Sequence, residues 1–180
     1  MSGTLVMIDC QTGFLDPVWG ERNNPHFEQN AQRLLSHWRT QGWPVVHVRH
    51  ASIEPNSPLG PDRPGFAFFE WAAPLENEAE VVKHVNSGFI GTNLEALLRN
   101  LGETNLTVAG LTTNHCVSTT VRMAGNLGFH VNLVGDACAT FGRHHANGAF
   151  YNAQTMHDTA LASLHGEFCT VTTADAFLMV

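Results

Sequence analysis

Two alternating patterns of hydrophobic positions along the chain predict an α/β fold. Short, continuously apolar runs, typical of buried parallel strands, alternate with longer stretches in which apolar residues recur at helical spacing. The strands predicted from the apolar runs cover residues 4–8, 44–48, 80–82, 106–109, 130–134 and 168–171. The helices predicted from the helical spacing cover residues 24–41, 92–101, 114–127 and about 145–164. This alternation favours a six-stranded, mainly parallel sheet with helices packed on it.

Local signals set the expected helix starts. Asn24 followed by Pro25 is typical of a helix N-cap and first turn. The sequence from Thr92 to Glu95 has the form of a capping box. In the last helix, apolar residues from Ala149 onward are expected to face the core.

Residues 51–78 break both patterns. This segment is rich in proline, glycine and aromatic residues and is long for a simple connection. Its length and irregularity indicate a functional loop or excursion rather than a linker, and its role stays open.

Composition and charge limit the classes of function. The 180 residues are 43% hydrophobic and 14% charged, which predicts a single domain over residues 1–180 with a substantial core. The formal net charge of −7, with no basic stripe, argues against nucleic acid and against a membrane surface as partners. The N-terminus has no signal-peptide pattern and no apolar run could span a bilayer, so we expect a cytoplasmic protein.

The four cysteines do not form a metal or disulfide pattern. Cys10, Cys116, Cys138 and Cys169 are widely spaced and include no CxxC pair. A zinc framework or a secreted disulfide scaffold would need tighter spacing. Most cysteines in a reducing compartment are small buried hydrophobic residues, so position must single out a reactive one.

The ends of the predicted strands gather the candidate chemistry. In open α/β sheets, ligands bind beyond the carboxyl ends of the strands. Those ends carry Asp9, the segment 47–50, Lys83, the turn 110–116 and Asp136. Asp9, Lys83 and Cys116 supply a carboxylate, an ammonium and a thiol, which form a coherent catalytic set.

Cys116 lies in the first turn of a predicted helix that directly follows a strand. The unpaired N–H groups and the helix dipole favour a thiolate there, and a nearby lysine would favour it further. A nearby carboxylate could accept the thiol proton, and backbone N–H groups could hold an oxyanion. Each residue taken alone also has a structural interpretation: Cys116 as a packed helix-start residue, Asp9 as a cap or ion pair, and Lys83 as a solvated edge-strand lysine.

Four segments in order resemble the isochorismatase-like hydrolase superfamily, which includes nicotinamidases, carbamoylsarcosine amidase-like enzymes and isochorismatases. The first is Val6-Met7-Ile8-Asp9-Cys10-Gln11-Thr12-Gly13-Phe14. The second is Val81-Val82-Lys83-His84, with Ser87-Gly88-Phe89 and Thr92-Asn93-Leu94 after it. The third is Gly110-Leu111-Thr112-Thr113-Asn114-His115-Cys116-Val117, continuing to Ala124, and the fourth is Asp136-Ala137-Cys138-Ala139-Thr140.

The resemblance implies a three-layer αβα fold with sheet order 3-2-1-4-5-6, which places Asp9 and Cys116 on adjacent central strands. It implies Asp9, Lys83 and Cys116 as the catalytic residues. It also implies a cis peptide bond between Leu111 and Thr112, and an oxyanion hole formed by the N–H groups of Thr112 and Cys116. No cofactor is expected.

The activity implied is that of a metal-independent cysteine hydrolase. It would cleave a C–N bond of a small amide, ureide or carbamoyl compound through a thioester intermediate. One alternative is an isochorismatase-type vinyl ether hydrolase, which does not rely on the cysteine. An alternative from another class is a non-catalytic binding or assembly protein on the same fold.

The sequence departs from the nicotinamidases of this superfamily at their metal site. Those enzymes carry an Asp-x-His pair and a further histidine, whereas residues 45–51 contain His47 and His50 without the carboxylate. We therefore predict no metal, with histidines that hydrogen-bond loops at a strand end, although either one could still be a ligand.

Candidate substrate-binding residues lie near the predicted strand ends. Aromatic side chains in such loops can line an apolar pocket or form a subunit contact. The candidates are Gln11, Phe14, Trp19, Phe89 and His115. Gln11 could instead orient Asp9, and the apolar loops suggest a homo-oligomer, either a dimer or a tetramer.

Overall fold

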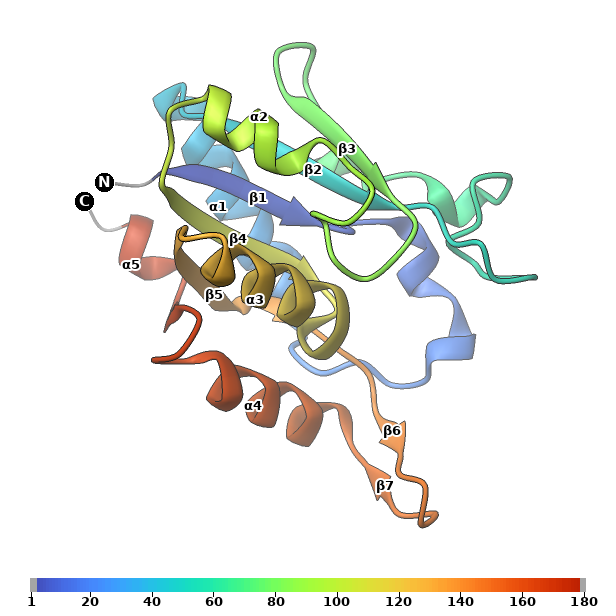
Figure 1. Ribbon diagram of the computed structural model, residues 1–180. Coiled ribbons are helices and arrows are strands. Elements are labelled where there is room, and N and C mark those ends of the chain that lie inside the picture. The colour runs from blue at the N-terminus through green and yellow to red at the C-terminus, as the bar shows by residue number, and fades with distance from the viewer. Residues whose placement is uncertain (1–2, 179–180) are drawn as a thin grey trace.

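A six-stranded parallel sheet forms the centre of the molecule, for which a computed structural model describes residues 3–178 (Figure 1). The ends of the predicted domain, residues 1–2 and 179–180, lie outside the described residues. The strands are β1 (Thr4–Ile8), β2 (Val45–His50), β3 (Ala79–Lys83), β4 (Asn105–Leu111), β5 (His130–Ala139) and β8 (Thr170–Thr172). They pair in parallel in the order β3-β2-β1-β4-β5-β8. This order confirms the predicted topology, with β8 as the sixth strand.

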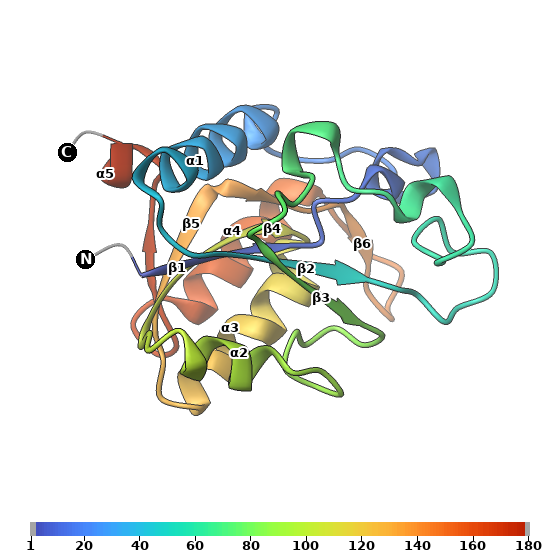
Figure 2. The same ribbon diagram turned by 90° about the horizontal axis from the view of Figure 1, so that it is seen from above.

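Helices cover both faces of the sheet, so the three-layer prediction is confirmed (Figure 2). One face carries α1 (Phe27–Gln41) and α5 (Asp175–Leu178), and the other carries α2 (Leu94–Asn100), α3 (Ser118–Asn126) and α4 (Ala153–Leu164). Side chains of β1 alternate between the two resulting cores: Leu5 and Met7 pack with α1, whereas Val6 and Ile8 pack with α2 and α3. Among the described helices, none is both long and apolar enough to cross a membrane.

The prediction of one long helix over residues 145–164 is wrong for residues 145–152, since α4 covers Ala153–Leu164. Strands β6 (Arg143–His144) and β7 (Phe150–Tyr151) form an antiparallel hairpin, here called the hairpin arm (residues 143–151), which projects from the body (Figure 1). Gly148 takes a φ of +87° in its turn, and Phe150 is 59% exposed rather than facing the core. The helix begins only at Ala153, where the Asn152 side chain accepts a hydrogen bond from the N–H of Thr155 at 2.8 Å.

Two predicted helix starts are also displaced. Asn24 has a φ of +51°, and its side-chain amide donates to two carbonyl oxygens of β5, both at 2.8 Å. Asn24 therefore joins the two segments, and α1 starts three residues later at Phe27. The Thr92 hydroxyl accepts a hydrogen bond from the N–H of Leu94 at 3.3 Å. Thr92 therefore lies one residue before the N-cap position, which Asn93 occupies, and α2 begins at Leu94.

The irregular segment 51–78 packs against the α1 side of the sheet. It contains two 3₁₀ turns, Pro64–Phe66 and Glu70–Ala72, and the first of these contacts a further turn, Thr12–Leu15. Leu59, Phe69 and Ala72 of this segment are buried in the same core as α1. The segment therefore extends the core beyond the sheet.

A buried ionic cluster joins this segment to the sheet. Glu78 accepts two hydrogen bonds from Arg39 of α1, at 2.7 and 2.8 Å, and its Oε2 lies 2.9 Å from Nε2 of His47 in β2. Burial alone would raise the pKa of Glu78, but the hydrogen bonds from Arg39, from the Leu75 N–H and from His47 lower this pKa to about 2. Since its ordinary value is near 4.5, the carboxylate stabilises the fold whenever it is ionised.

Replacing Glu78 with glutamine is expected to lower the free energy of unfolding by about 2 kcal/mol at pH 7. The folded-state pKa of Glu78 is depressed, so its contribution is complete above pH 4.5 and is lost as the pH falls towards 2. Urea unfolding of both proteins at pH 7 and pH 3 would show a smaller difference at pH 3. Glu95→Gln, which alters an exposed pair with Arg99, is the control; equal effects of the two substitutions at both pH values would contradict the prediction.

Candidate active site

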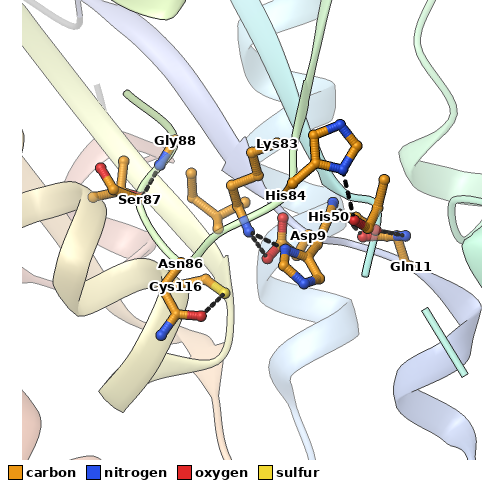
Figure 3. Close-up of polar contacts among 12 residues, drawn as sticks. Asp9, Gln11, His50, Lys83, His84, Asn86, Ser87, Gly88 and Cys116 are labelled. Carbon is orange, nitrogen blue, oxygen red and sulfur yellow. Dashed lines mark hydrogen bonds and ion pairs between the residues drawn. The ribbon is translucent and has the colours of Figure 1, made fainter. Parts of the chain in front are cut away.

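Three strand ends bring Asp9, Lys83 and Cys116 together at the carboxyl edge of the sheet (Figure 3). Asp9 directly follows β1, Lys83 ends β3, and Cys116 lies in the π-helical turn Thr113–Val117 that joins β4 to α3. Nζ of Lys83 lies 2.7 Å from Oδ2 of Asp9. Reactive atoms of Asp9, Cys116 and His50 all lie within 4.8 Å of one another. Residues from four separate parts of the chain therefore meet at one point.

Asp9 and Lys83 form an ion pair that is fully shielded from solvent. Both side chains are 0% exposed, and burying two charges is costly unless they are paired. Among the described residues, Oδ1 of Asp9 has no hydrogen-bond partner. Burial raises the pKa of Asp9 above its ordinary value, although the neighbouring Lys83 ammonium acts to lower it. The carboxylate is thus a stronger base than an exposed aspartate and has one oxygen free.

The thiol of Cys116 holds its proton more tightly than the sequence suggested. Burial and the charge of Asp9 raise the pKa of Cys116 well above its ordinary value, and Lys83 offsets only part of this. The expectation that the helix start lowers the pKa of Cys116 is therefore wrong, because the desolvation of the sulfur outweighs the favourable dipole. Reaction at neutral pH requires a base that removes the proton.

The turn that carries Cys116 is held from two sides. Oγ1 of Thr113 and Nδ1 of His157 in α4 share a buried hydrogen bond of 2.8 Å, and the hydroxyl of Thr140 bonds the side chain of Asn114. The peptide bond between Leu111 and Thr112 is cis. Thr112 and Cys116, whose N–H groups are the expected oxyanion hole, are 3% and 7% exposed.

Gly110 allows β4 to approach β1 closely just before this turn. It has a φ of +130°, and a Cβ atom at this position would lie 2.0 Å from the carbonyl oxygen of Ile8. Ile8 and Gly110 are register partners on the two strands. The absence of a side chain therefore sets the spacing between Asp9 and the turn that bears Cys116.

Gln11 is located differently from its expected place against the substrate. It is 0% exposed, and its amide donates to the carbonyl oxygens of His50 at 3.0 Å and Phe66 at 3.1 Å. Its Oε1 accepts from the N–H of His50 at 2.8 Å. Both ends of the amide are thus occupied by backbone groups, so Gln11 fixes the end of β2.

The three expected aromatic residues each pack on another aromatic ring. Phe14 and Trp19 pack on Phe141 in the α1-side core, with ring centroids 6.2 and 5.9 Å from it. Phe89 stacks on Phe129, which immediately precedes β5, at 6.1 Å. Phe14 and Trp19 therefore pack in the α1-side core, whereas Phe89 packs against the core cluster that contains Cys116 and stays a predicted substrate contact.

His115, the remaining candidate, lies beside Cys116 in the chain and close to the hairpin arm. Burial and the charge of Arg143 lower the pKa of His115, so the ring is neutral at pH 7. Because this half-buried ring directly precedes Cys116, His115 stays a predicted contact for substrate.

Two residues near the thiol were missing from the predicted set. Nδ1 of His50 lies 3.1 Å from Nζ of Lys83, and Oδ1 of Asn86 lies 3.7 Å from Sγ of Cys116. The position of His50 at a strand end marks it as a candidate, but the sequence predicts only a loop hydrogen bond or a metal ligand there. Nothing in the sequence marks Asn86 except its position three residues after Lys83.

The two histidines of β2 face opposite ways, as residues three apart on a strand must. His47 is fully buried against Glu78, whereas His50 points toward Lys83. They cannot share a metal ion. The donor atoms of Asp9, His50 and Cys116 are close enough for one, but the Lys83 ammonium already contacts two of these residues and would repel a cation.

Comparison with known proteins agrees with this fold. Residues 4–176 match the isochorismatase domain family. The isochorismatase family protein YrdC of Bacillus subtilis (strain 168) is 46% identical over 174 residues, which are 97% of this chain and 93% of YrdC. A solved structure of an isochorismatase-family protein from Chromobacterium violaceum has a TM-score of 0.95 and 46% identity, and the match covers 99% of this chain and 92% of that one.

A third relative carries a more specific name. The ureidoacrylate amidohydrolase RutB of Azorhizobium caulinodans is 32% identical over 92 residues, which are 51% of this chain and 40% of RutB. The match of the family domain along the described fold, and the similarity to YrdC over almost the whole of both chains, show that this chain belongs to the isochorismatase family of hydrolases.

Proposed function

We propose that this protein is a metal-independent cysteine amidohydrolase that acts on a small amide, ureide or carbamoyl compound. The observation that carries the proposal is the meeting of Asp9, Lys83 and Cys116 at one edge of the sheet. A thiol beside a buried carboxylate of raised pKa supplies a nucleophile and its base. The amidohydrolase among the relatives supports a C–N bond as the one cleaved.

In the first half of the proposed reaction, Asp9 takes the proton of Cys116 and the thiolate attacks the carbonyl carbon. The N–H groups of Thr112 and Cys116 hold the negative oxygen of the tetrahedral intermediate. Lys83 stabilises the negative charge that moves between Asp9 and the sulfur. Asp9 then gives its proton to the leaving nitrogen, and ammonia or an amine departs.

In the second half, Asp9 takes a proton from water, and the resulting nucleophile attacks the thioester. The carboxylic or carbamic acid leaves, and the thiol regains its proton from Asp9. The positive charge beside the reacting atoms comes from Lys83, so the scheme needs no metal ion.

A screen of small amides, ureides and carbamoyl compounds for ammonia release tests the proposal. For any substrate found, Cys116→Ala is expected to lower kcat/KM by at least about 1000-fold, because the covalent intermediate cannot form. Cys169→Ala is the matched control, since Cys169 is a buried cysteine that lies next to β8. The control should keep activity within about twofold of the wild type. Near-normal turnover by Cys116→Ala would refute the assignment of the nucleophile.

A further inference from the structure

His50 is positioned as a fixed neighbour of the catalytic lysine. It ends β2 and is the register partner of Lys83 on β3, so the two side chains leave the sheet side by side. Gln11 clamps its backbone on both sides, through the N–H at 2.8 Å and the carbonyl at 3.0 Å (Figure 3). The ring therefore has little freedom to move relative to the ammonium.

The contact between the two side chains fixes the protonation state of the ring. An ammonium group has only donors, so Nδ1 of His50 must accept at 3.1 Å from Nζ of Lys83. The proton of a neutral ring then sits on Nε2. Burial, and next the positive charges of Lys83 and His84, lower the pKa of His50 to about 4. A hydrogen bond with the backbone of Val85 acts in the opposite direction without cancelling these effects.

Charged and titratable groups face His50 from several parts of the chain. Lys83 at the end of β3 and His84 after it face His50, and so do Asp9, which follows β1, and Cys116 in the turn before α3. Lys83 divides its donors between Nδ1 of His50 and Oδ2 of Asp9, whereas Oδ1 of Asp9 is left without a partner among the described residues.

We propose that His50 is a positioning residue that aims the Lys83 ammonium at one oxygen of Asp9 and thereby keeps the other oxygen free to receive the proton of Cys116. The inference rests on the proposed function of the same three residues. Without the acceptor at Nδ1, the ammonium can turn to bind both oxygens of Asp9. The carboxylate then loses the oxygen that acts as base, although substrate can still bind.

Two substitutions of similar polarity separate this role from simple packing. The side-chain oxygen of asparagine can occupy the place of Nδ1, whereas that of glutamine reaches the place of Nε2. We expect His50→Gln and His50→Ala to lower kcat by about 10- to 100-fold with KM within about twofold, because small misplacements of reacting groups have effects of this size. His50→Asn should recover most of kcat. His130→Asn, at an exposed site at the amino end of β5, is the matched control.

A second readout needs no substrate. Alkylation of Cys116 by iodoacetamide, followed by mass spectrometry between pH 5 and 9, reports how readily the thiol loses its proton. His50→Gln should slow this alkylation by about the same factor as kcat and move its pH profile to higher pH, whereas His50→Asn should follow the wild type. Melting temperatures of all variants show whether each one folds.

The possible outcomes are distinct. If His50→Gln and His50→Ala match the wild type in kcat and in alkylation, or if asparagine is no better than glutamine, the positioning role is wrong. If Cys116→Ala retains activity, the proposed function itself is wrong, whatever the His50 variants show. An inactive Cys116→Ala together with wild-type behaviour of His50→Gln would remove only the inference about His50.

Discussion

Replacing Lys83 with methionine is expected to abolish hydrolysis and to lower the free energy of unfolding by about 3–5 kcal/mol. The substitution leaves the Asp9 carboxylate fully buried without its partner at 2.7 Å. A buried charge that loses its counter-charge must either be neutralised or pay its desolvation cost in full. Urea unfolding at pH 7 measures the change in stability, and the ammonia-release assay measures the change in activity.

Adding Asp9→Asn to Lys83→Met separates stability from catalysis. With both charges gone, we expect the double variant to recover most of the lost stability, since buried ion pairs replaced by neutral residues of similar volume are often tolerated. It should remain inactive, because it has neither base nor ammonium. Arg33→Met, which removes an exposed pair with Asp175, is the control and should cost less than about 1 kcal/mol. A double variant that still hydrolyses the substrate would exclude Asp9 and Lys83 from the reaction.

Gly110→Ala is expected to destabilise the protein by more than about 4 kcal/mol or to prevent folding. Two effects add at this position. The φ of +130° is strained for any residue with a side chain, and the new Cβ would lie 2.0 Å from the carbonyl oxygen of Ile8. The clash is with backbone, so β1 and β4 would have to separate just before Asp9 and the turn that holds Cys116.

Gly128→Ala provides the control for the strain alone. Gly128 has a φ of +85° with nothing within 4 Å of the position of a Cβ, so alanine there should cost only about 1–2 kcal/mol. Thermal or urea unfolding of both variants gives the comparison. Equal losses of stability would mean that the close approach of the two strands contributes nothing.

The sheet and the meeting of the three catalytic candidates could be predicted because both follow from simple geometry. Apolar runs mark buried strands, and parallel strands place their carboxyl ends at one edge. Asp9 and Lys83 therefore had to lie at that edge, together with the turn that holds Cys116. The topological order came from the resemblance of four short segments, and the structure has the same order.

The remaining features depend on contacts that one sequence does not reveal. Ala149 and Phe150 fit a helical period, but a turn at Gly148 and the cap at Asn152 place them in the hairpin arm. The direction of the pKa shift of Cys116 depends on how completely the surrounding segments exclude water, which no local pattern reports. The clamp that Gln11 forms on β2 joins residues 39 apart.

The raised pKa of Cys116 also affects how the protein withstands oxidants. Peroxides attack thiolates far faster than thiols, and repeated oxidation to sulfinic or sulfonic acid is irreversible for most enzymes. Under the proposed mechanism, a Cys116 thiol that stays protonated until Asp9 acts on it is a poor target for such damage. A buried thiol that keeps its proton is therefore less open to such oxidation than a permanent thiolate would be.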